Sequence, residues 1–211
     1  LVSRTKNRPL ASGKMGMTEA WLYFILLATL SLCLLFFVPL YTIYASLVVA
    51  VFIMIYPLTK RFLKAPQFFL GITFGSGTII AFSLVSSDFS LSLLILFIGT
   101  VLWIISFDTI YAFEDIADDL KIGINSTPIL WGDQALNISK YLHLAFYVSL
   151  ALIGFINKFS SFFLLVLIIL LGLYIHQRRL INNDQYLDAF KFNNWIGMFA
   201  SIGFVIEAFL I

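Results

Sequence analysis

The chain has 211 residues, of which 61% are hydrophobic and 17% aromatic, while only 11% are charged. A soluble domain carries about a quarter charged residues, so this composition excludes an ordinary soluble domain and predicts a polytopic membrane protein. The formal net charge of +2 is too small to predict nucleic-acid binding, and a single cysteine, Cys33, excludes a disulfide within the chain.

Seven apolar segments are long enough to cross a bilayer, which takes about 17–25 mostly apolar residues per helix. In chain order they are Trp21–Val38, Leu40–Pro57, Gln67–Val85, Leu91–Tyr111, Tyr141–Asn157, Ser160–His176 and Phe192–Leu210. Tight turns with Pro, Ser and Asn separate them on one side, and longer polar loops separate them on the other. The predicted fold class is therefore all-α, a polytopic membrane helical bundle with seven transmembrane helices.

The basic residues are divided unequally between the two sides of this bundle. Only Lys158 falls on the side of the short turns. The side of the long loops receives Arg4, Lys6, Arg8, Lys14, Lys60, Arg61, Lys64, Lys121, Lys140, Arg178, Arg179 and Lys191. The positive-inside rule predicts that this second side faces the cytoplasm.

An acidic run, D-T-I-Y-A-F-E-D-I-A-D-D, covers Asp108 to Asp119, where the fourth span meets water. On a continuous helix advancing about 100° per residue, Asp108, Asp115 and Asp119 fall within roughly 40° of one another. Carboxylates at the mouth of a hydrophobic bundle need a counter-charge. A magnesium ion with a phosphorylated ligand would supply one. A solvated helix end with ordinary loop charges is the alternative.

Two basic clusters share the predicted face with the acidic run. The first is R-T-K-N-R-P-L-A-S-G at Arg4–Gly13, and the second is Y-P-L-T-K-R-F-L-K-A-P-Q at Tyr56–Gln67. Cytoplasmic Lys and Arg need no ligand, which is the alternative interpretation of both clusters. Arginines aimed at the same place as metal-binding acids make a site for diphosphate.

These three segments resemble a known family. D-T-I-Y-A-F-E-D-I-A-D-D-L-K-I-G-I-N-S-T-P-I-L-W-G, at Asp108–Gly132, resembles the second aspartate-rich motif of the 4-hydroxybenzoate polyprenyltransferases, in the UbiA superfamily of intramembrane prenyltransferases. The basic clusters resemble the segment after that family's first motif and its basic loop, in the family's order. The resemblance implies a bundle of nine helices with a magnesium-dependent site at its cytoplasmic mouth.

The resemblance also implies roles for the acidic residues. Asp115 and Asp119 match the D-x-x-x-D pair that would hold magnesium and the diphosphate, and with Arg61 they are the candidate catalytic residues. Asp108 and Asp118 belong to the same motif and are further candidate metal ligands.

The basic residues match positions that bind substrate. Lys60 and Arg61 match the basic pair that would bind the substrate. Arg4 and Arg8 match positions beside the diphosphate. Tyr111 is a candidate, on spacing alone, for stabilising an allylic carbocation with its ring face.

The implied reaction is transfer of a polyprenyl group from polyprenyl diphosphate to the ring of 4-hydroxybenzoate, for ubiquinone synthesis. The cofactor is Mg²⁺, and the partners are the two substrates and the lipid bilayer, with no nucleic acid. The location implied is the bacterial inner membrane or the mitochondrial inner membrane, with the active-site loops facing cytoplasm or matrix.

One departure from the family pattern concerns its first motif. That motif, N-D-x-x-D with a further Asp, is expected just upstream of Arg4, and residues 1–20 contain no such Asn-Asp pair. We therefore expect residues 1–211 to be a single transmembrane prenyltransferase domain, truncated at its N-terminus by about two helices. One alternative is an inactive fragment of the enzyme. Another is a transporter or channel with an Asp–Arg site for an anion or proton, which predicts charges deep within several spans.

Three smaller features carry expectations of their own. The glycines of G-I-T-F-G-S-G (Gly71, Gly75 and Gly77) predict close contact between helices, and the alternative is that they leave room for the isoprenoid. His143 and His176 are expected to extend toward the cytoplasmic interface, and Glu207 is expected to reach water from the last span.

Overall fold

Helices make up all of the regular structure that the computed structural model gives to the described residues, 6–210. The long helices are α1 (Met17–Leu34), α2 (Leu40–Thr59), α5 (Leu91–Ala112), α8 (Ala135–Ile156), α9 (Ser161–Asn182) and α11 (Asn193–Leu210). The shorter ones are α3 (Pro66–Gly75), α4 (Gly77–Ser83), α6 (Ile116–Ile122), α7 (Thr127–Trp131) and α10 (Tyr186–Lys191). Three 3₁₀ turns complete the set: η2 (Leu35–Phe37), η3 (Phe113–Asp115) and η4 (Gly132–Gln134). The all-α fold class is confirmed.

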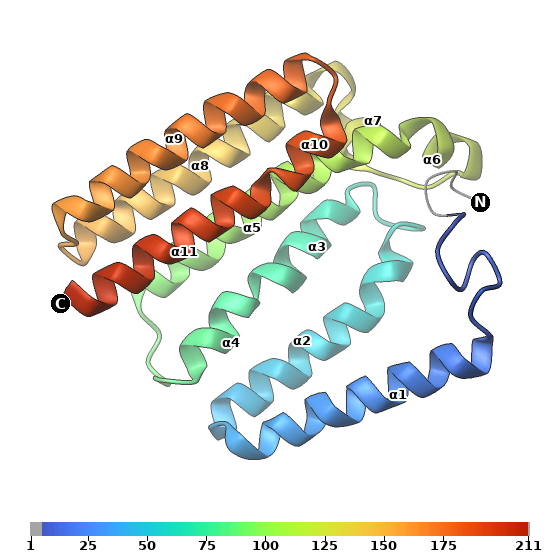
Figure 1. Ribbon diagram of the computed structural model, residues 1–211, viewed down its shortest axis with the longest axis horizontal. Helices are drawn as coiled ribbons and strands as arrows, with labels where there is room; N and C mark the ends of the chain where they lie inside the picture. Colours follow the sequence, from blue (N-terminus) through green and yellow to red (C-terminus); the bar gives the residue numbers. More distant parts are fainter. Residues whose placement is uncertain (1–5, 211) are drawn as a thin grey trace.

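The order of these elements gives seven passes along the bundle, formed by α1, α2, α3 with α4, α5, α8, α9, and α10 with α11 (Figure 1). Within residues 6–210, six helical segments are long and apolar enough to cross a membrane. The remaining pass is the third, predicted at Gln67–Val85, which is divided between α3 and α4.

The third pass is interrupted at Ser76, whose own N–H and carbonyl keep their helical hydrogen bonds. The Ser76 N–H donates to the Ile72 carbonyl at 3.0 Å, and the Ile80 N–H donates to the Ser76 carbonyl at 3.0 Å. The Ser76 hydroxyl donates to the same Ile72 carbonyl at 2.7 Å, a bond that tends to bend helices. With ten residues in α3, seven in α4 and Ser76 between them, the pass rises about 27 Å. This length is close to that of a bilayer core, so the third predicted span exists as a bent helix.

The loops separate between the two ends of the bundle as the sequence predicts. The segment before α1, the α2–α3 turn, α6, α7 and the α9–α10 turn lie at one end, and the α1–α2, α4–α5 and α8–α9 turns lie at the other (Figure 1). Lys60, Arg61 and Lys121 therefore share the first end, and Lys158 lies at the second. The predicted division is confirmed for the basic residues within 6–210, while Arg4 lies outside them and the assignment of the first end to the cytoplasm stays a prediction.

Helix α5 is the centre of the bundle, because α8 and α3 both pack along it. Toward α8, a Cβ atom on Gly99 would lie 2.7 Å from the Ser149 Cβ, so only glycine permits this approach. Nearer the C-terminal end of α5, the same interface contains a pair of hydrogen bonds. The Ser106 hydroxyl donates to the Ser139 carbonyl at 2.8 Å, and the Ser139 hydroxyl donates to the Ser106 carbonyl at 3.1 Å. Small residues and interhelical hydrogen bonds are what hold helices together in lipid.

The glycine prediction is confirmed at two positions and wrong at the third. A Cβ on Gly71 would lie 2.9 Å from an Ile105 side-chain atom, and one on Gly75 would lie 2.7 Å from a Val101 side-chain atom. A Cβ on Gly77 would meet nothing within 4 Å, because this residue lies past the bend. Gly71 and Gly75 thus allow α3 to lie against α5.

Two polar residues predicted at the interface are buried instead. His143 is 1% exposed, and its ring centroid lies 5.0 Å from that of Tyr147 and 5.2 Å from that of Tyr174, between α8 and α9. Glu207 is also 1% exposed and accepts hydrogen bonds from the Ser160 N–H at 2.8 Å and the Ser160 hydroxyl at 2.5 Å. Both expectations are wrong for these residues, since each side chain packs against a neighbouring helix. His176 is exposed, and its extension toward the cytoplasmic interface stays a prediction.

Candidate functional site

Asp108 is the centre of a polar group at the loop-rich end of the bundle. Its half-buried carboxylate lies near the Gln67 side chain and within electrostatic range of Lys60 and Asp115. Tyr56 in turn interacts with Asp108 and with Tyr111. The end of α2, the beginning of α3 and the end of α5 therefore meet around one carboxylate.

The basic loop owes its shape to residues at its two ends. The Thr59 hydroxyl donates to the Tyr56 carbonyl at 2.6 Å and closes the last turn of α2, while Pro66 opens α3 at a position that needs no N–H donor. Lys60, directly after α2, is half-buried, whereas Arg61 is exposed. Of the predicted basic pair, Lys60 lies within electrostatic range of Asp108, whereas the Arg61 side chain is exposed.

The acidic run is not one continuous helix, so that part of the prediction is wrong. Helix α5 ends at Ala112, the 3₁₀ turn η3 covers Phe113–Asp115, and α6 begins at Ile116. The cause lies in α10, to which η3 is attached: the Phe113 ring stacks on that of Tyr186 with centroids 5.0 Å apart, and the Glu114 carboxylate accepts the Leu187 N–H at 3.0 Å. These contacts redirect the chain, so the helical spacing computed for Asp108, Asp115 and Asp119 does not apply.

The remaining acids occupy α6 with different exposures. Asp119 is 4% exposed, and its backbone carbonyl accepts the Ile124 N–H at 3.0 Å. Asp118 forms an ion pair with Lys121 at 3.8 Å. Asp115 is half-buried at the end of η3. The acidic residues therefore lie at the same end of the bundle but in two elements.

The acids provide only oxygen donors, which suit magnesium. Within residues 6–210, no three His, Cys, Asp or Glu side chains gather as a set that would hold a metal by themselves. Magnesium usually takes one or two protein carboxylates and completes its shell with water and substrate phosphates. The donor set thus fits an ion that is bound together with a phosphorylated ligand.

The N-terminal basic cluster is described only in part. Arg4 lies outside the described residues. Arg8 is exposed, and its carbonyl accepts the Ser12 N–H at 2.8 Å in a turn before α1. This segment lies at the same end as α6 and α7 (Figure 1). The proximity of Arg8 to a bound diphosphate stays a prediction.

A cavity of about 460 Å³ lies directly beside Asp108, between α2, α3, α5 and α10. Its wall is formed by Ile53, Tyr56, Pro57, Leu70, Thr73, Phe74, Ile104, Phe107, Asp108 and Phe190. Among these described residues, Asp108 carries the only charge. Tyr111 contacts the wall through Phe190, with ring centroids 4.5 Å apart. The arrangement is an apolar, aromatic chamber with a charged mouth.

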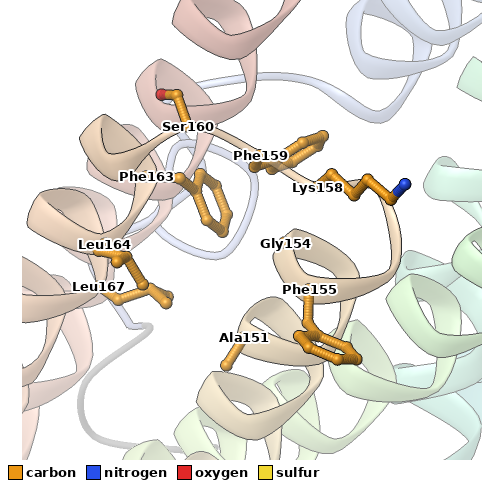
Figure 2. A pocket seen from close by; sticks show the side chains of 9 residues that line it. All are labelled: Ala151, Gly154, Phe155, Lys158, Phe159, Ser160, Phe163, Leu164 and Leu167. Carbon is orange, nitrogen blue, oxygen red and sulfur yellow. The ribbon is translucent and has the colours of Figure 1, made fainter.

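A second pocket, of about 350 Å³, lies at the opposite end, in the α8–α9 turn (Figure 2). Phe155, Phe163 and Leu167 are among its apolar lining, and Lys158 extends away from them (Figure 2). None of the described residues that line it is acidic. It lacks the groups that bind a metal–diphosphate, so the candidate site is the cavity beside Asp108.

Sequence reasoning missed Gln67, Asn125 and Thr127, which connect the loops around the site. The Thr127 N–H donates to the Gln67 side-chain oxygen at 3.0 Å, and the Asn125 N–H donates to the Lys60 carbonyl at 3.2 Å. One signal was available for Gln67, because an amide side chain at the start of an apolar span needs a buried partner.

Comparison with known proteins places the chain in a family. The model of the UbiA prenyltransferase family matches residues 1–203. A 4-hydroxybenzoate octaprenyltransferase of Colwellia psychrerythraea is 37% identical over 209 residues, which is 98% of this chain and 73% of that protein. The enzymes of the same name from Tolumonas auensis and Escherichia fergusonii are 34% and 36% identical, over 97% and 96% of this chain and 73% and 71% of theirs.

Solved structures share the fold. A UbiA homologue from Aeropyrum pernix superimposes with a TM-score of 0.83 at 24% identity, over 98% of this chain and 78% of that one. A digeranylgeranylglyceryl phosphate synthase superimposes with a TM-score of 0.70 at 25% identity, over 99% of this chain and 76% of that one. With a family match over nearly the whole chain and six helices apolar enough to span a membrane among residues 6–210, the chain belongs to the UbiA prenyltransferase family of multi-pass membrane enzymes.

Proposed function

We propose that this enzyme transfers a polyprenyl group from polyprenyl diphosphate to the ring of 4-hydroxybenzoate. The observation that carries the proposal is the polar group around Asp108, Lys60 and Asp115 at the mouth of an apolar, aromatic cavity. One end of this arrangement suits a diphosphate and the other suits an isoprenoid. The acceptor is inferred from relatives named 4-hydroxybenzoate octaprenyltransferase that are 34–37% identical. We further propose that the chain acts as a single transmembrane domain.

The diphosphate would be bound at the acidic and basic mouth. Asp115 and Asp119, with Asp108 and Asp118 as further candidates, are the residues that would hold Mg²⁺. When bound, the ion neutralises charge on the diphosphate and makes it a better leaving group. Lys60, which lies within electrostatic range of Asp108, would bind a phosphate oxygen through its ammonium group. Arg61, Arg8 and Arg4 would add further cationic contacts.

The cavity would protect the allylic cation that remains when the carbon–oxygen bond to the diphosphate breaks. Its apolar wall would limit the access of water, which would otherwise capture the cation. Tyr56, Phe107 and Phe190 line the chamber, and aromatic faces attract cations. Tyr111, behind Phe190, would reinforce this wall.

The acceptor would enter at the same mouth. The alternative role for the exposed Arg61, in place of a contact with the diphosphate, is to bind the acceptor carboxylate in a bidentate pair and orient the ring toward the cavity. A carbon–carbon bond then forms beside the ring hydroxyl and the ring loses one proton. The basic loops would face the cytoplasm, or the matrix in a mitochondrion, so the soluble acceptor arrives from that side.

The test uses the purified chain in liposomes, with labelled polyprenyl diphosphate, 4-hydroxybenzoate and Mg²⁺. We expect magnesium-dependent formation of the prenylated acid. Replacing Asp115 or Asp119 with Asn should abolish it, because the amide is a poor magnesium ligand. Binding of inorganic pyrophosphate in the presence of Mg²⁺, followed by calorimetry, reports on the same residues independently of turnover.

Asp133→Asn is the matched control, since Asp133 is exposed in η4 at the same end but outside the acidic run. It should leave both measurements unchanged. Full activity in Asp115→Asn and Asp119→Asn would remove these residues from the metal site. Pyrophosphate binding without any transfer would favour the inactive fragment. Transport of an anion or proton into protein-containing liposomes, without transfer or pyrophosphate binding, would favour a transporter.

A further inference from the structure

We infer that Asn193 is a positioning residue that holds Phe190 in the wall of the cavity beside Asp108, where Phe190 would contact the isoprenoid of the substrate. This inference rests on the proposed function, because it concerns the apolar part of the same site. It assigns a role to a residue that lies outside the acidic run, the basic pair and the cavity lining.

The hydrogen bonds of Asn193 connect α5 to the end of α10. Asn193, the first residue of α11, is 6% exposed. Its side-chain oxygen accepts the Trp103 indole N–H of α5 at 2.9 Å. Its amide nitrogen donates to the carbonyls of Ala189 at 3.2 Å and Phe190 at 2.9 Å, both in α10. The partners determine which way the amide is turned, since an indole N–H can only donate and a carbonyl can only accept.

These bonds supply donors at the place where one helix gives way to the next. Helix α10 ends at Lys191 and α11 begins at Asn193, within a span apolar enough to cross a membrane. Carbonyl groups at such an interruption need donors from the protein, because lipid offers none. The Ala189 carbonyl also accepts the Gln177 amide of α9 at 2.8 Å. Side chains of α9 and α11 together therefore hold the end of α10.

Trp103 gives Asn193 a fixed partner. The Trp103 ring stacks on that of Phe146 of α8, with centroids 4.8 Å apart and 7° between the planes. On α11, a Cβ atom on Gly197 would lie 3.0 Å from a Trp103 ring atom, so the ring lies closely against this helix. The indole N–H is thus presented to Asn193 from a ring that packs against both α8 and α11.

Phe190 is the residue by which α10 contributes to the cavity wall. Its ring centroid lies 4.5 Å from that of Tyr111 and 5.8 Å from that of Phe107, both in α5. Asn193 bonds to the carbonyl of Phe190 itself, so it sets the backbone position from which this ring projects. Phe107 also meets the Trp103 ring edge-on, with centroids 5.5 Å apart. The amide and the aromatic wall are therefore parts of one connected set of contacts.

The consequence concerns the isoprenoid and not the diphosphate. Displacement of Phe190 would loosen the wall around the isoprenoid, while the charged groups at the mouth stay in place. A difference of one methylene group in an apolar pocket changes discrimination between ligands by about 10–200-fold. Asn193→Leu, which is of similar size but makes none of these hydrogen bonds, should weaken binding of an isoprenoid-bearing ligand by about tenfold. Binding of inorganic pyrophosphate should not change.

The experiment measures the melting temperature of the purified full chain in detergent, with Mg²⁺ held constant. One titration uses inorganic pyrophosphate, and the other uses farnesyl thiolodiphosphate, whose bridging sulfur slows cleavage. A ligand that binds the folded state raises the melting temperature, so the half-maximal concentration of each ligand is obtained without turnover.

We compare wild type, Asn193→Leu, Phe190→Ala and the double variant. Asn193→Leu should raise the half-maximal concentration of the farnesyl ligand about tenfold in the wild-type background. It should not raise this concentration further in the Phe190→Ala background, because the effect passes through Phe190. A residue that only stabilises the fold would lower the melting temperature of the free protein and would affect the two ligands equally.

Asn194→Leu is the matched control, since Asn194 is the same residue type at the next position of α11 and is exposed. It should leave both half-maximal concentrations unchanged. If Asn193→Leu does not fold, Asn193→Ser serves instead, because it stays polar while its shorter side chain cannot bond to Trp103 and α10 together.

The outcomes separate this inference from the proposed function. Wild-type protein that gains no stability from either ligand would contradict the proposed diphosphate site and this inference with it. A wild type that responds to both ligands, with Asn193→Leu responding at the same farnesyl concentration, would overturn only the role of Asn193. An equal shift in the Phe190→Ala background would also overturn it, because the effect would not pass through Phe190.

Discussion

Helices α5 and α1 resemble each other as sequences and differ completely in their surroundings. The span that contains α5 has a mean hydropathy of 2.2, and the span formed by α1 and η2 has 2.3. In the first, 39% of the most apolar window is buried, and in the second none is. Hydropathy therefore predicts that a helix enters the bilayer, but it does not predict how far that helix is buried among the other helices.

The difference comes from the small and polar residues. In α5, Gly99 and Ser106 bring α8 close and bond to it. In α1, the Ser31 hydroxyl donates at 2.9 Å to Leu27 of its own helix, so it provides no bond to a neighbour. Because lipid is as apolar as a leucine side chain, helices associate through close packing and interhelical bonds.

The largest effect should come from filling the α5–α8 contact. Gly99→Leu would place a side chain where the Ser149 Cβ lies 2.7 Å from an added Cβ, and overpacking of this kind costs about 1–3 kcal/mol. Titration of the detergent-solubilised protein with dodecyl sulfate measures the free energy of unfolding. The control, Ser31→Leu on exposed α1, should change it by no more than about 0.5 kcal/mol. Equal losses of unfolding free energy in Gly99→Leu and Ser31→Leu would contradict the difference between α5 and α1.

A smaller effect is expected from removing an apolar side chain. Ile105 is 1% exposed and Leu30 is 55% exposed. In a membrane the transfer part of the usual large-to-small penalty is absent, so Ile105→Ala should cost about 1–2 kcal/mol through lost packing. Leu30→Ala should have nearly no effect on the same titration, since lipid replaces the lost methyl groups. A large loss for Leu30→Ala would mean that α1 has a packing partner.

The smallest effect concerns the serine pair between α5 and α8. A double-mutant cycle with Ser106→Val and Ser139→Val should give a coupling of about 0.6 kcal/mol, which is typical of interhelical bonds in membranes. Combining Ser31→Val with Ser139→Val should give no coupling, because Ser31 bonds within α1. A coupling near zero for the first pair would show that packing alone joins the two helices.

Much of the fold could be predicted from the sequence because span length and loop charge are local properties. The break at Ser76 was not predicted, since the hydroxyl that bends the chain sits within an otherwise uniform apolar run. The turn at Phe113–Asp115 was not predictable from periodicity, because its cause is the contact with Tyr186 and Leu187, more than seventy positions further on.

In the candidate site, too, the features that depend on residues far apart in the sequence could not be predicted. The acidic run and Lys60 were predicted because charges at the ends of apolar spans are conspicuous. The amide of Gln67 was not, because its meaning depends on Thr127, which is 60 residues away and reached only through the left-handed turn at Gly123. Burial of His143 and Glu207 was missed for a similar reason, since each depends on a neighbouring helix.

The hydrogen bond between the Thr127 N–H and the Gln67 side-chain oxygen bears on how the protein is made. Gln67 lies at the start of α3, and Thr127 follows it by 60 residues in the chain. The buried amide oxygen therefore finds its partner only after the loop before α7 has been synthesised. Maturation of the acidic mouth must accordingly follow translation of α7.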